Sequence, residues 1–140
     1  MQLSQYIFRI TALCCCLASF SVNAELVAIV SAHADVGAIS KSDLANIYLG
    51  KNVSSAPSLS PIDQKAGPTR AHFYEVLLGK TIPEMSAYWS REVFTGHAYP
   101  PREEAGDAGV KAAVSENPSY IGYVNSNVVD GSVKIVTHID

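Results

Sequence analysis

Residues 61–70, PIDQKAGPTR, contain residue types and a spacing that commonly bind a small anion. In this segment a glycine-containing loop runs into a predicted helix start at Gly67. Unpaired backbone N–H groups and the positive end of the helix dipole meet at such a place. Thr69 can add a hydroxyl and Lys65 or Arg70 a positive charge, although Pro68 removes one backbone donor. On the residues alone, a plain loop-to-helix connection with a Thr or Gly cap is the favoured interpretation, and the anion site stays open as the alternative.

Aromatic and basic residues are interleaved in a second segment, residues 88–102. In one interpretation, Arg91, His97 and Arg102 line a site for an anionic ligand or partner. In the other, the apolar side chains belong to the core, and Arg91 and Arg102 lie on the surface among acidic residues. The apolar residues concerned are Trp89, Val93 and Phe94, and the acidic ones are Glu92, Glu103 and Glu104.

The sequence has no spacing that would indicate catalysis or a metal site. The four histidines, His33, His72, His97 and His138, are scattered and form no HExxH pattern. There is no GxSxG sequence, and the three cysteines, at positions 14–16, precede the predicted mature chain. We therefore expect a protein that is not an enzyme and that holds no metal ion or other cofactor.

The composition indicates one globular domain. The chain has 140 residues, of which 48% are hydrophobic and 16% charged, and its formal net charge is −3. A chain without an excess of positive charge lacks the electrostatic footprint of a nucleic-acid-binding protein. We therefore expect no nucleic-acid partner.

Residues 1–24 have the features of a secretory signal peptide. Arg9 precedes an apolar run over residues 10–22, and small residues follow at the expected cleavage point, Ala24. The run is shorter than the roughly 20 residues that span a bilayer as a helix. We expect residues 25–140 to form the mature, exported domain. An uncleaved anchor and acylation of a signal cysteine are alternatives that the sequence leaves open.

The elements that must position the candidate residues alternate between strand and helix patterns. Apolar runs predict strands near both ends of the mature chain, and capping residues with helical periodicity predict the helices between them. The fold class is therefore α/β, with a small mixed sheet covered by helices. The predicted strands are 25–31, 58–62 (weak), 120–124 and 132–138, and the predicted helices are 40–49, 67–78, 81–95 and 107–115.

Several segments, in the same order along the chain, resemble bacterial periplasmic phosphate-binding proteins of ABC transporters. The resemblance covers nearly all of the predicted mature chain and is closest to short, single-lobe members of the type II periplasmic-binding-protein superfamily. The segments are ISKSDLANIYLGK (39–51), PIDQ (61–64), AYW (87–89), VFTG (93–96), PP (100–101) and NPSYIGYV (117–124).

The resemblance implies the fold of one lobe of such a protein and binding of phosphate or a related oxyanion. Thr69 and, more loosely, Gly67 carry over from the family's phosphate loop, whereas Asp63 lies near the place of a family arginine. A carboxylate there repels phosphate unless it accepts a proton from the ligand. With the charges from the loop and the end of the 120–124 strand, the candidate ligand-binding residues are Lys65, Gly67, Thr69, Arg70 and Tyr123.

Two functions follow as hypotheses. The first is a periplasmic solute-binding-like protein that binds phosphate or another oxyanion for ABC-type uptake or sensing. The second is a non-catalytic interaction module that docks on a membrane sensor or transporter without capturing a ligand, because one lobe alone cannot close over a solute. A homodimer would rebuild a two-walled cleft, and the sequence does not decide whether it forms.

Overall fold

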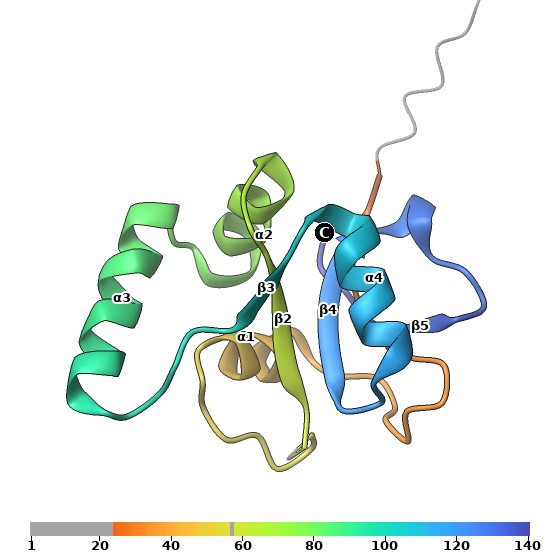
Figure 1. Cartoon of the computed structure of the whole chain (residues 1–140), viewed down its shortest axis with the longest axis horizontal. Coiled ribbons are helices and arrows are strands. Elements are labelled where there is room, and N and C mark those ends of the chain that lie inside the picture. The colour runs from red at the N-terminus through yellow and green to blue at the C-terminus, as the bar shows by residue number, and fades with distance from the viewer. Residues whose placement is uncertain (1–23, 57) are drawn as a thin grey trace, which may run out of the picture.

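The computed structural model describes residues 24–56 and 58–140, and in this part of the chain five strands form one mixed sheet in the order β3–β2–β4–β1–β5 (Figure 1). β2, β3 and β4 run parallel, whereas β1 is antiparallel to both β4 and β5. The strands are β1 (Leu26–Ser31), β2 (Ser60–Gln64), β3 (Arg102–Glu104), β4 (Tyr120–Asn125) and β5 (Val133–His138).

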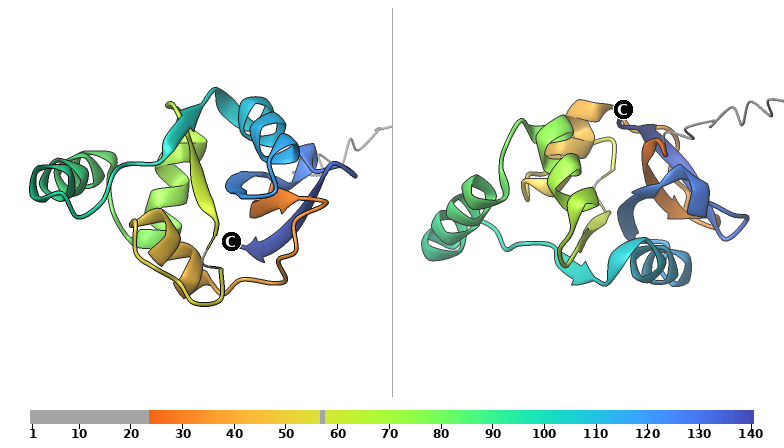
Figure 2. Two further views of the ribbon diagram at one scale, coloured as in Figure 1. Left: turned by 60° about the horizontal axis from the view of Figure 1, so that its bottom comes forward. Right: turned by 90° about the horizontal axis from the view of Figure 1, so that it is seen from above.

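β1 is buried along its whole length because it lies inside the sheet and is covered on both faces. Its continuous Val, Ile and Leu run is the pattern of a strand with two buried faces. Ala28 and Val30 face one core cluster, and Val27 and Ile29 face the other. The molecule therefore has three layers, with helices on each side of the sheet (Figure 2).

The helices begin and end where the sequence places caps. Ser40 Oγ accepts a hydrogen bond from the Asp43 amide at the start of α1, and Thr81 and Glu84 form a capping box at the start of α3. Gly79 and Gly96 end α2 and α3 in the left-handed conformation. The helices are α1 (Lys41–Tyr48), α2 (Pro68–Leu78), α3 (Ile82–Thr95) and α4 (Gly106–Glu116), and a 3-10 turn, η1 (Ser126–Val128), follows β4.

Each face of the sheet has its own apolar cluster. α4 packs on one face through Val110 and Val114, which approach the sheet over Gly122, where a side chain would leave no room. On the other face, α1 and α2 bury an aromatic group of Tyr48, Phe73, Tyr74 and Tyr123. This second face carries most of the polar site described below.

α3 stands apart from the sheet in all the views (Figures 1 and 2). It is held at one side of the aromatic cluster on the second face through Met85, Tyr88 and Trp89. Tyr88 Oη donates a hydrogen bond to the Leu49 carbonyl at 2.7 Å, which ties α3 to the end of α1. The outer side of α3 has no cover from the described residues.

The structure confirms the predicted α/β class and differs from the sequence-based expectation in two places. β3 lies within a segment expected to be a loop, because its three residues pair only along the edge of β2. Val93 and Phe94, which one interpretation of the sequence assigned to the core, are exposed. Phe94 is 93% exposed, because the end of α3 extends beyond the rest of the domain. The predicted signal peptide lies outside the described residues except for Ala24. No helix in the described ranges is long and apolar enough to cross a membrane.

Candidate functional site

The site lies where the parallel strands β2 and β4 approach their carboxyl ends. The strands pair at Ser60–Tyr120 and Pro61–Ile121, and side chains bridge them further on. Gln64 Nε2 donates to the Tyr123 carbonyl at 3.2 Å, and Tyr48 Oη donates to the Ile62 carbonyl at 2.8 Å. Open α/β sheets commonly bind ligands at the carboxyl ends of their strands. The side chains that lie at this position therefore determine which ligands it can bind.

A buried carboxylate, Asp63, is at the centre of the site. Its side chain is 2% exposed. Oδ1 accepts hydrogen bonds from Tyr123 Oη at 2.5 Å and from the Gln64 amide at 2.8 Å. Oδ2 accepts from Tyr74 Oη at 2.6 Å and from Arg70 Nε at 3.2 Å. Donors from β2, β4 and α2 thus converge on one side chain.

These four donors use the full accepting capacity of the carboxylate, which has about four lone-pair sites. Asp63 therefore has no site left to accept a proton from a phosphate. The surroundings agree, because no buried side-chain nitrogen or oxygen of the described residues lacks a hydrogen-bond partner. The charge of Asp63 is balanced by Arg70, and the pair is satisfied as a buried pair must be to persist.

Aromatic packing fixes the two phenols that hold Asp63. The ring of Tyr123 stacks on that of Phe73 with centroids 3.7 Å apart, and Tyr74 packs edge-on against Phe73 at 5.2 Å. Burial, and then the negative charge of Asp63, raise the pKa of Tyr74 and Tyr123 well above the ordinary value of 10.0. Both hydroxyls therefore stay protonated and act as donors.

Arg70 is oriented by several groups at once. Its guanidinium lies 5.6 Å from the centre of the Tyr74 ring and 3.5 Å from a carboxylate oxygen of Glu103. Partial burial lowers the pKa of Arg70, but Asp63, Tyr74 and Glu103 together outweigh this, so the net shift of the pKa is upward. The Arg70 guanidinium thus forms ion pairs with two carboxylates of the chain itself, those of Asp63 and Glu103.

A second carboxylate, Asp107, occupies the neighbouring helix start. It belongs to the first turn of α4, where a negative charge is favoured by the helix dipole. Gln64 Nε2 donates to its Oδ1 at 2.8 Å, and Asn125 donates to its Oδ2 from Nδ2 at 2.9 Å and from its amide at 3.3 Å. Two of the chain's own carboxylates thus take the side-chain donors at the ends of β2 and β4.

The structure does not bring the five predicted ligand residues together at one site. Arg70 and Tyr123 meet, but on Asp63. Thr69 lies nearer β4, where its hydroxyl is 3.5 Å from Asn125 Nδ2. Lys65 and Gly67 are exposed in the loop before α2. Their role toward a ligand stays a prediction.

The basic residues of the second segment do not converge on one site either. Arg102 donates to Glu104 at 2.5 Å and to Tyr120 Oη at 3.4 Å, and His97 lies 3.9 Å from Glu92. Arg91 is exposed on α3. The interpretation in which the arginines lie on the surface among acidic residues therefore describes Arg102 better than an anion site does.

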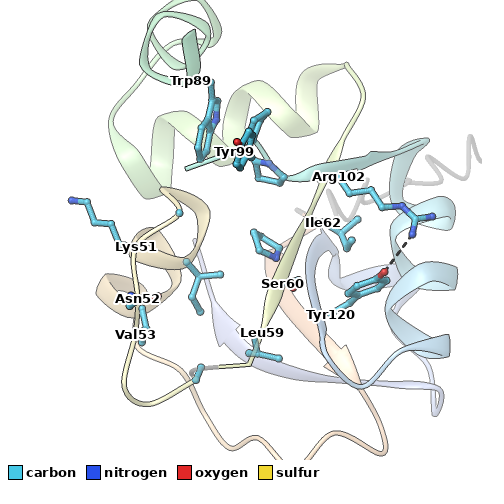
Figure 3. A pocket seen from close by; sticks show the side chains of 16 residues that line it. Lys51, Asn52, Val53, Leu59, Ser60, Ile62, Trp89, Tyr99, Arg102 and Tyr120 are labelled. Carbon is cyan, nitrogen blue, oxygen red and sulfur yellow. Dashed lines mark hydrogen bonds between the residues drawn. The ribbon is translucent and has the colours of Figure 1, made fainter. Parts of the chain in front are cut away.

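A hollow of about 440 Å³ separates the end of α1 from the segment that leads into β3. Trp89 and Tyr99 border it, and Lys51 points away from it (Figure 3). Arg102, on the opposite side, is turned toward Tyr120. The hollow thus has positive residues along its border but none directed into it, and most of its lining residues are aliphatic, proline or aromatic. Among the described residues, no group of three or more His, Cys, Asp or Glu side chains is placed to hold a metal ion.

Comparison with solved structures shows a periplasmic-binding-protein-like fold. An ABC-type phosphate transport receptor from Vibrio cholerae matches 81% of this chain with a TM-score of 0.62 and 22% identity. A substrate-binding protein ascribed to a phosphate ABC transporter, with bound phosphate, from Clostridium perfringens matches 81% with a TM-score of 0.61 and 22% identity. PstS from Borrelia burgdorferi matches 81% with a TM-score of 0.55 and 19% identity.

These matches confirm the fold that the sequence resemblance implied. The chain covers 45%, 44% and 46% of the three solved chains, so it spans less than half of their length. Two of the three are described as a phosphate transport receptor and as a substrate-binding protein of a phosphate ABC transporter. No protein-family model matches the chain. A comparison with curated proteins found no match either.

Sequence reasoning missed Tyr74, Gln64 and Asp107 as members of the site. Tyr74 carried a usable signal, because it follows Arg70 by four residues on a predicted helix and so shares its face. Asp107 stands in the first turn of a predicted helix, where an acidic residue is common for reasons of stability alone. Only the three-dimensional arrangement shows that Tyr74 and Asp107 contact residues of β2.

Proposed function

We propose that the chain is a non-catalytic, periplasmic binding-protein-like module that acts by docking on a membrane transporter or sensor, without capturing an anion at the ends of β2 and β4. One observation carries the proposal: the carboxylate of Asp63 takes the donors Arg70, Tyr74, Tyr123 and the Gln64 amide. An external oxyanion at this position would face the buried carboxylate of Asp63 and the half-buried carboxylate of Asp107, and would have to displace one of them.

The surface that supports docking is the outer side of α3 and the segment after it. Phe94 and Tyr99 are 93% and 73% exposed, and Val93 is 42% exposed. Large exposed apolar side chains gathered in one region mark interaction surfaces more often than chance. A transporter or sensor is the partner that this fold favours, because one of the solved proteins is described as an ABC-type transport receptor.

Site-specific photo-crosslinking in the producing cell tests this docking. A benzophenone amino acid replaces Phe94 in one variant and Ser132, an exposed residue of the turn before β5, in the control. We expect an adduct with an integral transporter or sensor protein, identified by mass spectrometry, from position 94 only. An adduct of twice the chain's mass would identify a second copy as the partner and contradict the proposal. Identical adducts from both positions, or none from either, would also contradict it.

The second candidate is binding of phosphate or a related oxyanion at the start of α2, for uptake or sensing. It is supported by the N-cap Gly67, which makes no side-chain capping bond, beside the exposed Lys65 and the Thr69 hydroxyl. The solved protein with bound phosphate has a similar fold over the 44% of its length that this chain matches. Calorimetric titration of phosphate, sulfate and acetate decides between the candidates. Saturable heat with phosphate that Lys65→Gln and Thr69→Val both weaken favours oxyanion binding, and its absence favours docking alone.

A further inference from the structure

We propose that Arg70, Tyr74, Tyr123 and the Gln64 amide form a carboxylate-binding cradle, and that Asp63 is the residue that closes it to external oxyanions by occupying it. The inference goes beyond the proposed docking function, because it assigns a latent site, a ligand class and the residue that determines its specificity. The ligand class is a small monocarboxylate, the chemical group that Asp63 itself presents.

The cradle is held in place by contacts that do not involve Asp63. Tyr123 stacks on Phe73, Tyr74 packs against the edge of Phe73, and Tyr48 packs edge-on against Phe73 at 4.7 Å. The Tyr48 hydroxyl is separately fixed on the Ile62 carbonyl. Removing the carboxylate therefore leaves two phenol donors close to their present positions, as a site supported by its surroundings requires.

The charge of the cradle also favours an anion. Arg70 is the cation on Asp63, at 3.2 Å. It is held from other sides by the Lys65 carbonyl at 3.5 Å, by the Tyr74 ring and by Glu103. Glu103 is about half exposed and solvated, so it offsets the guanidinium less than the buried Asp63 does. Without Asp63, two phenols, one amide and a guanidinium are left with a buried cavity of carboxylate size, and such donors are costly to leave unpaired.

Two variants separate the occupant from the cradle. Asp63→Ala removes the carboxylate and leaves space for formate, whereas Asp63→Asn keeps the space filled, removes the charge and replaces one acceptor oxygen by an NH2 donor. Thermal unfolding is followed by circular dichroism in sodium formate and in sodium chloride of equal ionic strength. Formate should raise the midpoint of Asp63→Ala, by about 6 °C at ten times its dissociation constant. It should not raise the midpoint of the native chain or of Asp63→Asn beyond the chloride value.

The double variant Asp63→Ala/Tyr123→Phe lacks one donor and should require a higher formate concentration for the same shift. If Asp63→Ala is unfolded in chloride, recovery of its helical signal in formate is the supporting result. The absence of a formate-specific gain in Asp63→Ala, from a folded or an unfolded start, would overturn the proposal. An equal gain in Asp63→Asn would overturn it as well. Neither result would bear on docking, which the crosslinks from position 94 judge separately.

Discussion

Tyr123 on β4 donates its phenol proton to Asp63 on β2 at 2.5 Å, across the two parallel strands just beyond their last paired residues. The bond joins strands that side chains, rather than the backbone ladder, hold together at this point. It also uses a donor that would otherwise face the carboxyl end of the sheet. Stability and ligand exclusion therefore depend on the same atoms.

The two phenol donors should each contribute measurably to stability. Tyr74→Phe and Tyr123→Phe each leave Asp63 with one donor fewer in a buried place, and we expect each to lower the free energy of unfolding by about 1–3 kcal/mol. Tyr99→Phe, which changes a ring that is 73% exposed, serves as the control and should stay within about 0.5 kcal/mol. Urea unfolding measures all three. Equal effects at the three positions would show that the Asp63 bonds contribute little.

The contact between α3 and α1 depends on Gly50. Its φ is +72°, and a Cβ there would lie 2.8 Å from the Cβ of Ala98 and 3.4 Å from the Trp89 ring. Gly50→Ala should therefore cost the roughly 1–2 kcal/mol of a left-handed alanine plus about 1–3 kcal/mol of overpacking. Gly79→Ala, with φ +62° and nothing near its added Cβ, should show the first cost alone. Tryptophan fluorescence should change in the Gly50 variant only, and the same loss of stability in both would argue against a tight contact at Gly50.

Alkaline pH should unfold the protein through its buried tyrosines. Burial, first, and then Asp63 raise the pKa of Tyr48, Tyr74 and Tyr123 above that of an unfolded tyrosine. Below pH of about 10 both states keep these protons and the full stability is present. Above it, only the unfolded state releases them, so the free energy of unfolding falls by about 1.4 kcal/mol per pH unit for each phenol.

Three such phenols give a slope of about 4 kcal/mol per pH unit. Urea unfolding at a series of pH values measures it, and phenolate absorbance reports the ionisation. The Tyr74→Phe/Tyr123→Phe double variant should lose about two thirds of the slope. Phenolate absorbance from all tyrosines before any loss of helical signal would contradict the burial argument.

Asp107 should stabilise the end of the sheet more than an ordinary surface carboxylate does. Asp107→Ala removes the acceptor of Gln64 Nε2, Asn125 Nδ2 and the Asn125 amide, together with a favourable charge at the start of α4. A loss of about 1–3 kcal/mol is expected in urea unfolding. Glu116→Gln, at the exposed end of the same helix, is the matched control and should be nearly neutral. A loss no larger than the control's would mean that water replaces the missing acceptor.

Local patterns predicted most of the fold. The apolar run of β1, the Thr81–Glu84 capping box and the glycines after α2 and α3 each act within a few residues, so the sequence displays them directly. β3 was missed because its pairing depends on an edge of β2 that is distant in sequence. Phe94 was misassigned in one interpretation because helical periodicity does not tell how far a helix extends beyond the core.

The candidate site was harder to predict than the fold. The residue types at Arg70 and Tyr123 indicated an anion site, and both do hold an anion, namely Asp63. Chemical complementarity alone does not distinguish an external anion from a carboxylate of the chain. That distinction depends on whether Asp63 points inward from β2, which follows from the strand's register and from the aromatic cluster beneath it.

A titration of the isotopically labelled protein with inorganic phosphate, followed by amide NMR, tests the central claim most directly. The claim is that the chain's own carboxylates occupy the anion-binding position at the ends of β2 and β4. We predict that the amides of Gln64, Thr69 and Arg70 shift no more in phosphate than in sodium chloride of equal ionic strength. Saturable, phosphate-specific shifts of these amides, with one dissociation constant, would contradict the claim.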